Sequence, residues 1–318
     1  MKRITLLFPG QGSQYAGMGK SWDQHFREFG TVLDEASDTI HVDMRELCFE
    51  DREDRLWLTQ YTQPAILTIS HAVLAVLRSR FGIECELTAG HSLGEYSALV
   101  ALGALRFNDA VRAVHERGLA MSEALAPGAG GMLVYMGTHG FEIAKLCEEL
   151  SRPGFVLEIA NHNSPRQLVL TGHRAALQRA DAEIATRELG STVSLPLSGA
   201  FHSTLMEPVA EHLTHYLARL RFAAFSGSLV ANIDATLHSS ATYTRGHLAQ
   251  QVARSVLWGR SLKRLHEVSP NALWLEVGPG KTLTKLLRAN IGAQDACHSD
   301  DVECLSLIER ALESRFAA

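Results

Sequence analysis

The stretch that decides the fold is LTAGHSLGEYSALVALGAL, residues 87–105. Its apolar start predicts a short buried strand over residues 87–90, and residues 95–105 are rich in helix formers. A strand that passes through a tight turn into a helix is typical of α/β folds. The turn, GHSLG, matches the G-x-S-x-G pattern of a nucleophile elbow, where only glycine fits on either side of the sharp bend. The elbow predicts that the hydroxyl of Ser92 stands clear of the backbone as a nucleophile.

The pattern is weak by itself, because glycine and serine are common and a chance loop can match it. The predicted strand and helix on either side favour the elbow. Ser92 would also lie at a helix N-terminus, where backbone N–H groups favour developing negative charge.

Two segments before the elbow fit the same α/β body. Residues 4–8 form an apolar run that ends at Pro9-Gly10, which predicts a buried strand leading into the glycine-rich loop of residues 10–14. Residues 64–81 carry apolar positions at helical spacing, and Pro64 suits the first turn of a helix.

A linker follows the elbow region, at residues 126–131 (APGAGG). The next segments alternate in the order βαββαβ, which is the ferredoxin-like arrangement. The predicted strands are Met132–Met136, Phe155–Ala160, Gln167–Thr171 and Thr192–Leu197, and the predicted helices are Phe141–Leu150 and His173–Leu189. We therefore expect residues 1–130 and 198–318 to form an α/β-hydrolase-like catalytic body, with residues 131–197 inserted as a ferredoxin-like subdomain.

A serine nucleophile needs a base, and the chain contains 15 histidines. His202 follows a predicted strand and precedes a helical stretch at residues 205–220, so it lies at a strand end, where bases usually stand. His91 is a competitor beside the serine, but neighbours on a tight elbow point apart, so we expect it to order the loop. The residues alone leave His202 as one candidate among several.

Composition excludes several classes of protein. The net charge of -5 offers no basic excess for nucleic acid, and no apolar run approaches the roughly 18 residues that span a membrane. The five cysteines are scattered and form no CxxC pair, which fits a reducing, cytoplasmic setting. Cys297 and Cys304 flank His298, but this spacing matches no standard zinc pattern, so we expect no metal.

Seven motifs in order carry a family resemblance. They are FPGQGSQ (8–14), TQPA (62–65), GHSLGEY (90–96), RG (117–118), NHNSP (161–165), GAFHS (199–203) and EVGPG (276–280). Together they resemble malonyl-CoA:acyl carrier protein transacylases, a family that includes the acyltransferase domains of polyketide synthases. The resemblance covers nearly the whole chain.

The resemblance implies a catalytic pair. Ser92 would form the acyl-enzyme, and His202 would act as its general base and acid. In this family a backbone carbonyl, not a carboxylate, orients the histidine. The matching position is Gln251, although Gln250 beside it leaves the register open by one residue. A carbonyl that accepts the Nδ1 proton still fixes the histidine tautomer.

The resemblance also implies a substrate site. The backbone N–H groups of Gln11 and Leu93 would form the oxyanion hole. Arg117 would pair with the free carboxylate of malonyl through its planar guanidinium, with Gln63 shaping the site. Without the motif, Arg117 would be read as a cation on a solvated helix face. Phe201 and Leu93 are the choices of malonyl-specific members.

The implied reaction is ping-pong transfer of malonyl from malonyl-CoA to the phosphopantetheine thiol of an acyl carrier protein, for fatty acid or polyketide synthesis, without a metal or redox cofactor. A hydrolase of acyl carrier proteins on the same scaffold is the nearest competing function, but it would not need Arg117. The chain could also transfer a different acyl group, or serve a synthase as a catalytically silent docking subunit.

Overall fold

The computed structural model describes residues 4–196, 199–292 and 295–316. The larger of two sheets has the strand order β10-β9-β1-β2-β7-β8, and only the β7–β8 pair is antiparallel. Its strands are β1 (Ile4–Phe8), β2 (Leu87–Gly90), β7 (Ser228–Val230), β8 (Leu237–His238), β9 (Leu273–Glu276) and β10 (Ala296–His298). The predicted strands at residues 4–8 and 87–90 are confirmed, and they pair in parallel at the centre of the sheet.

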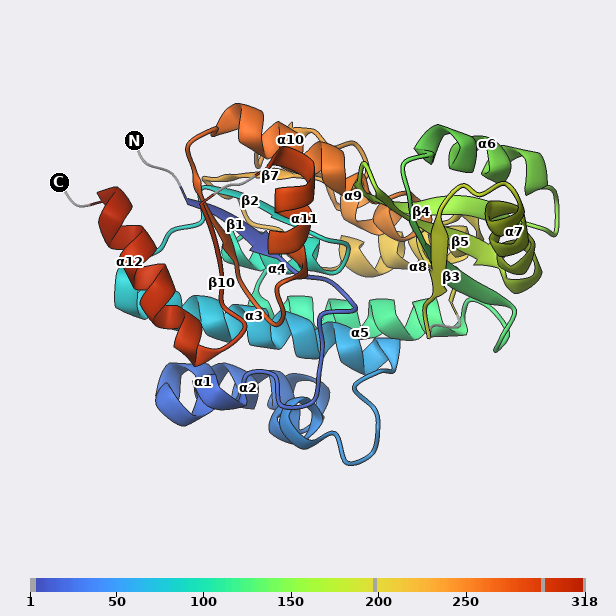
Figure 1. The fold of residues 1–318 in the computed structure, drawn as a ribbon. Helices are drawn as coiled ribbons and strands as arrows, with labels where there is room; N and C mark the ends of the chain where they lie inside the picture. Colours follow the sequence, from blue (N-terminus) through green and yellow to red (C-terminus); the bar gives the residue numbers. More distant parts are fainter. Residues whose placement is uncertain (1–3, 197–198, 293–294, 317–318) are drawn as a thin grey trace.

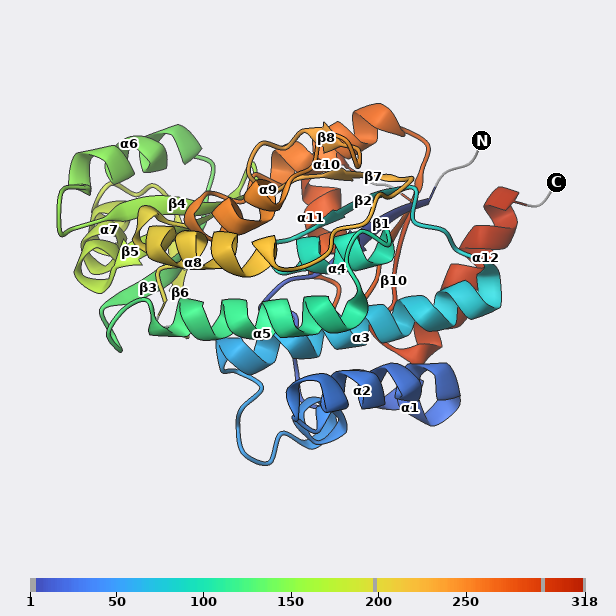
Figure 2. The same cartoon turned by 180° about the vertical axis from the view of Figure 1, so that it is seen from behind.

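Helices surround this sheet: some lie on its two faces, and others, such as the pair at residues 20–40, pack on those helices (Figures 1 and 2). They are α1 (Lys20–His25), α2 (Arg27–Ile40), α3 (Thr59–Phe81), α4 (Gly94–Ala101), α5 (Phe107–Glu123), α8 (Glu207–Ala218), α9 (Arg245–Gln250), α10 (Trp258–Val268), α11 (Thr282–Ile291) and α12 (Leu305–Phe316). Short helical turns occupy Glu46–Glu50, Thr204–Met206, Gln251–Ala253 and Val302–Cys304.

The alternation of side chains along β1 explains why the larger sheet has an apolar core on each of its two faces. Leu6 and Phe8 lie in the core shared with α3, α4 and α5, whereas Leu7 lies in a separate core with Trp258 of α10 and Leu287 of α11. Successive side chains of a strand point to opposite faces, so one apolar run supports both layers. Continuous apolar strands of this kind are what a parallel sheet covered on both sides requires.

The helix after the elbow is shorter than predicted. It ends at Ala101 rather than residue 105, because Gly103 adopts a left-handed conformation (φ 76°). The N–H of Gly103 donates to the carbonyl of Val100, and that of Ala104 donates to the carbonyl of Leu99. This is the Schellman pattern, which ends a helix at a glycine.

The smaller sheet is antiparallel, with the order β4-β5-β3-β6, and it lies at one end of the molecule with two helices on it (Figure 1). Its elements are β3 (Gly130–Met136), α6 (Gly140–Leu150), β4 (Leu157–Ser164), β5 (Gln167–His173), α7 (Arg174–Thr186) and β6 (Ser191–Ser194). The predicted βαββαβ order and ferredoxin-like arrangement are confirmed. The predicted boundary between residues 197 and 198 lies outside the described residues, so the exact division into subdomains stays a prediction.

Among the described residues, no helix is both long enough and apolar enough to cross a membrane.

Candidate active site

Ser92 sits on a strained turn between β2 and α4. Its φ is 50°, in the left-handed region that non-glycine residues rarely adopt. A Cβ added at Gly90 would lie 1.9 Å from the carbonyl carbon of Gly94, and one added at Gly94 would lie 2.1 Å from the carbonyl oxygen of Phe8. Both contacts are impossible for a real side chain. The two glycines of the G-x-S-x-G pattern are therefore required by close backbone packing.

His202 lies next to Ser92, although the two are far apart in sequence. The distance from Ser92 Oγ to His202 Nε2 is 2.7 Å. His202 Nδ1 lies 2.8 Å from the carbonyl oxygen of Gln251 and 3.2 Å from that of Arg254. With Nδ1–H donating to these carbonyls, Nε2 keeps its electron pair toward the serine hydroxyl. The carbonyl next to the imidazole belongs to Gln251, not to Gln250.

The imidazole of His202 is poised as a neutral base. Burial, and then the positive charge of Arg117, lower the pKa of His202 to about 3. An imidazole with such a pKa carries no proton on Nε2 near neutral pH, so it can accept the proton of Ser92 Oγ.

Arg117 projects from α5 into the same site and is buried, with 1% of its surface exposed. Its Nη1 donates to Gln63 Oε1 at 2.7 Å, and its Nη2 donates to Gln251 Oε1 at 3.0 Å and to Ser92 Oγ at 3.1 Å. Burial lowers its pKa. Among the described residues, Arg117 forms no ion pair, and its Nε–H has no hydrogen-bond partner. The charge of the buried Glu95 acts on Arg117 but makes no ion pair with it, and a buried guanidinium without a direct ionic partner is costly unless a ligand supplies one.

The glycine-rich loop packs directly against the elbow. A Cβ at Gly10 would lie 2.3 Å from the carbonyl oxygen of His91, and the N–H of His91 donates to the carbonyl of Phe8 at 2.9 Å. This contact brings Gln11 beside the turn that carries Leu93. Within the described part of the chain, the backbone N–H groups of Gln11 and Leu93 have no hydrogen-bond partner. Two free N–H groups near a nucleophile can stabilise an oxyanion.

The imidazole of His91 lines the same cavity but is bonded to the smaller sheet rather than to Ser92. Its Nε2 lies 2.9 Å from Asn163 Oδ1 on β4, and its ring meets the edge of Trp258. The elbow is thereby tied to the smaller sheet. As expected from the sequence, this histidine orders the loop.

A cavity of about 380 Å³ joins these groups. Ser92, His202, Arg117, Gln11 and Phe201 line it, whereas Leu93 does not. Side chains of β3, β4, β5 and α11 complete its walls, so both sheets contribute to the site. A mainly apolar cavity with a few convergent polar groups is the usual form of a small-molecule site.

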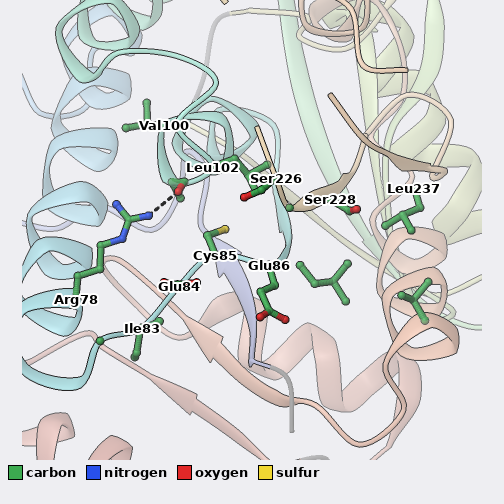
Figure 3. Close-up of a pocket in the computed structure, with 16 residues that line it drawn as sticks. Arg78, Ile83, Glu84, Cys85, Glu86, Val100, Leu102, Ser226, Ser228 and Leu237 are labelled. Atoms are coloured by element: carbon green, nitrogen blue, oxygen red, sulfur yellow. Dashed lines mark hydrogen bonds between the residues drawn. The ribbon is translucent and has the colours of Figure 1, made fainter. Parts of the chain in front are cut away.

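A larger cavity of about 970 Å³ lies at the opposite ends of β2 and β7 (Figure 3). It contains Cys85, but burial raises the pKa of this thiol to about 12, so the thiolate is scarce near neutral pH. Arg78 beside it donates to the carbonyl of Ala101. None of the predicted site residues lines this cavity.

Two buried residues that hold the elbow were not predicted. Asn232 Oδ1 accepts from the backbone N–H of Ser92 at 2.7 Å, and Asn232 Nδ2 donates to the carbonyl of Gly90 at 2.7 Å. The carboxylate of Glu95 accepts from the Asn232 backbone and from Gln251 Nε2, each at 2.9 Å. Burial raises the pKa of Glu95. Asn232 follows a short apolar run, and this position at the end of a strand is the sequence signal that could have indicated a site residue.

The fold and this site are those of an acyl transferase, and the family profile described as "Acyl transferase domain" matches residues 5–300. Curated relatives named malonyl CoA-acyl carrier protein transacylase are 37% identical, over 96% of this chain and 98% of the Salmonella typhimurium protein, and over 91% and 90% for Bacillus subtilis. The chain belongs to the malonyl-CoA:acyl carrier protein transacylase family.

Solved structures agree. The Clostridium perfringens transacylase superposes with a TM-score of 0.92 at 33% identity, covering 98% of both chains. A malonyl-transacylase solved in complex with a type II polyketide synthase acyl-carrier protein also gives 0.92 at 33% identity, covering 98% of this chain and all of that one (100%).

Proposed function

We propose that this chain transfers a malonyl group from malonyl-CoA to the phosphopantetheine thiol of an acyl carrier protein, through an acyl-Ser92 intermediate. The observation that carries the proposal is Arg117, a buried cation that hydrogen-bonds Ser92 Oγ yet forms no ion pair among the described residues. A substrate with a free carboxylate would supply the ion pair that Arg117 lacks. The names of the relatives point to the same substrate class.

The first half-reaction follows from the distances. Ser92 Oγ attacks the thioester carbonyl while its proton passes to His202 Nε2, 2.7 Å away. The oxyanion forms beside the backbone N–H groups of Gln11 and Leu93. When the tetrahedral intermediate collapses, the C–S bond breaks, and His202 returns the proton to the departing coenzyme A sulfur. The product is malonyl-Ser92 with a neutral histidine.

The second half-reaction runs the same steps with the carrier thiol. His202 accepts the thiol proton, the sulfur attacks the acyl carbonyl, and Ser92 Oγ leaves with the proton from Nε2. Ser92 carries the acyl group and His202 carries the proton between the two thiols, so the proposed chemistry needs no metal or redox cofactor. Malonyl transfer to an acyl carrier protein would serve fatty acid or polyketide synthesis.

Arg117 also separates transfer from the competing function, hydrolysis of acyl carrier proteins. A hydrolase for neutral chains would gain nothing from a buried guanidinium. Arg117 Nη1 donates to Gln63 Oε1 and Arg117 lines the cavity, so the second Nη1 hydrogen is available to a carboxylate. We further propose a cytoplasmic setting, because all five cysteines are free.

The test is the intact mass of the protein after incubation with malonyl-CoA alone. We expect a gain of one malonyl group in the wild type and in Ser122→Ala, a control at an exposed serine, and no gain in Ser92→Ala. Adding holo carrier protein should discharge the acyl-enzyme much faster than water does. Labelling of Ser92→Ala at normal stoichiometry would remove Ser92 from its role, and equal discharge with and without carrier would indicate a hydrolase.

A further inference from the structure

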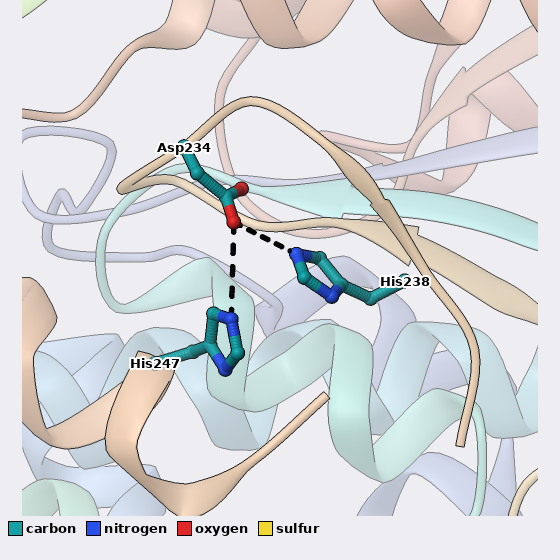
Figure 4. Close-up of side chains that lie close together, drawn as sticks. All are labelled: Asp234, His238 and His247. Atoms are coloured by element: carbon teal, nitrogen blue, oxygen red, sulfur yellow. Dashed lines mark hydrogen bonds and ion pairs between the residues drawn. The ribbon is translucent and has the colours of Figure 1, made fainter. Parts of the chain in front are cut away.

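Two imidazoles and a carboxylate converge outside the catalytic cavity (Figure 4). Asp234 lies on the turn between β7 and β8, His238 ends β8, and His247 lies in the first turn of α9. Asp234 Oδ2 is 2.9 Å from His238 Nε2 and 3.8 Å from His247 Nε2. All three ligand atoms lie within 4.8 Å of one another, and no other such group of three occurs in the part of the chain that the structure describes.

We propose that Asp234, His238 and His247 bind a divalent transition-metal ion of the zinc class. Imidazole nitrogen and carboxylate oxygen are the ligands that Zn²⁺ takes in sites with three protein ligands, where water fills the fourth position. Bond lengths of about 2.0–2.2 Å in a tetrahedral site place neighbouring ligand atoms about 3.3 Å apart. The observed separations of 2.9 and 3.8 Å lie on either side of that value. The two imidazole nitrogens lie within 4.8 Å of each other, so movements of up to about 1 Å would bring the three ligands to tetrahedral spacing.

The carboxylate is already oriented for this task. Asp234 Oδ1 accepts from the backbone N–H of Thr236 at 2.9 Å, which leaves Oδ2 facing the two rings. The side chain of Asp234 is 34% exposed and that of His247 is 20% exposed, whereas His238 is almost covered. The ion can therefore enter from solvent while one ligand stays fixed in the protein. Outer hydrogen bonds of this kind are what hold metal ligands in place.

The rings are also held by packing. Tyr243 stacks on the ring of His247 (centroids 5.2 Å apart) and meets the edge of the ring of His238. His247 Nδ1 accepts from the backbone N–H of Thr244 at 3.1 Å and lies 2.9 Å from Thr244 Oγ1. A metal on Nε2 requires the ring proton on Nδ1, where it can donate to Thr244 Oγ1. A metal at the site would thus replace this backbone hydrogen bond and the 2.8 Å contact between Thr236 Oγ1 and His238 Nε2, and the buried His238 Nδ1 would carry its proton without an acceptor among the described residues.

The cluster lies directly behind the catalytic elbow. Asn232, two residues before Asp234, accepts from the N–H of Ser92, and α9 leads into Gln251, whose carbonyl faces His202. An ion held by Asp234, His238 and His247 would therefore join the two segments that position the serine and the histidine. We expect it to act as a structural clamp. This inference does not depend on which acyl group is transferred.

The experiment uses the full chain, stripped with a chelator and titrated with Zn²⁺ by calorimetry, with Co²⁺ absorption spectra as a second readout. The wild type should bind one equivalent and melt at a higher temperature with zinc. Asp234→Asn and His247→Gln should weaken zinc binding more than about 100-fold, since even outer-sphere changes cost about 10–100-fold. Asp234→Asn keeps an acceptor for Thr236, so it decides the question if His247→Gln fails to fold.

Two controls address other zinc ligands. His212→Ala removes an exposed histidine that contacts a single carboxylate, and Cys304→Ser removes the thiol that lies 3.5 Å from His298 Nδ1. Both variants should bind zinc as the wild type does. The proposal is wrong if the wild type binds no equivalent of zinc at micromolar concentration, if Asp234→Asn binds it unchanged, or if only Cys304→Ser loses it.

Discussion

Replacing Arg117 by alanine tests both the acyl group and the reaction type. In the wild type the malonyl carboxylate would meet a guanidinium that is 1% exposed and has an unpaired Nε–H. In Arg117→Ala the same carboxylate would enter a buried site without a cation. Acetyl-CoA carries no carboxylate, so it has nothing to leave unpaired. We therefore expect the variant to lose malonyl transfer while acetyl transfer is spared or improved.

The size of the loss follows from the burial. Leaving one member of a buried charge pair without its partner costs about 2–5 kcal/mol, which is roughly a 30- to 5,000-fold fall in kcat/KM. The variant also leaves Gln63 Oε1 and Gln251 Oε1 without their donor. That second effect disturbs the site for both donors alike. The ratio of the malonyl to the acetyl kcat/KM isolates the charge, and we expect it to fall at least about 30-fold.

The assay measures kcat/KM for both donors, with a parallel measurement of thioester hydrolysis. Arg117→Lys should recover little, because an ammonium cannot reach Gln63, Gln251 and a substrate carboxylate with the planar fork of a guanidinium. Thermal melting of each variant serves as the folding control. An equal loss for malonyl and acetyl would mean that Arg117 is structural, and the argument for a carboxylate substrate would fail even if the serine mechanism stands.

Three further predictions address the elbow, the base and the carrier protein. Asn232→Ala leaves two backbone groups of the elbow unpaired and should lower the free energy of unfolding by about 1–3 kcal/mol for each, measured by urea denaturation; unchanged stability would contradict this. Because burial and Arg117 lower the pKa of His202 to about 3, wild-type kcat/KM should stay flat from pH 8 down to about 5, and Arg117→Ala assayed with acetyl-CoA should lose activity at a higher pH than the wild type does. A wild-type decline centred near pH 6.5 would refute it. Lys281 and Lys285 are exposed beside the cavity wall, so reversing both charges should raise the KM for an acidic carrier protein at low salt without slowing acylation; an unchanged KM would exclude this surface.

The central strands and the order of the smaller sheet could be predicted because their signals are local. Residues 4–8 and 87–90 are unbroken apolar runs, and Gly10 and Gly90 mark where each strand turns. Strands β7 and β10 have three residues each, too few to show any period. They exist because neighbouring strands offer unpaired backbone groups. Such strands depend on tertiary pairing, which no single segment encodes.

The site residues divide in the same way. Ser92 is marked by its own turn, but His202 reaches it only because the fold joins positions 110 residues apart. Arg117 carried a local signal, since Val114 and Met121 lie three before it and four after it, so the arginine stands on the buried face of α5. An arginine within the apolar stripe of a helix is buried, and a buried charged residue indicates a functional or structural role. Because Arg117 lies on the buried face of α5, it is not a solvated cation.

The polar layer behind the elbow explains how a strained serine is kept in place. Ser92 holds a positive φ, which costs about 1–3 kcal/mol for a residue with a side chain. Apolar packing alone cannot fix that conformation, because it does not direct the backbone N–H. The hydrogen bond from the Ser92 N–H to Asn232 directs the backbone N–H of the serine. The buried carboxylate of Glu95 holds Asn232 in turn, and it also accepts from Tyr243 at 2.7 Å. Since Tyr243 also packs on His238 and His247, an ion at that cluster would stiffen the same chain of contacts from its far end.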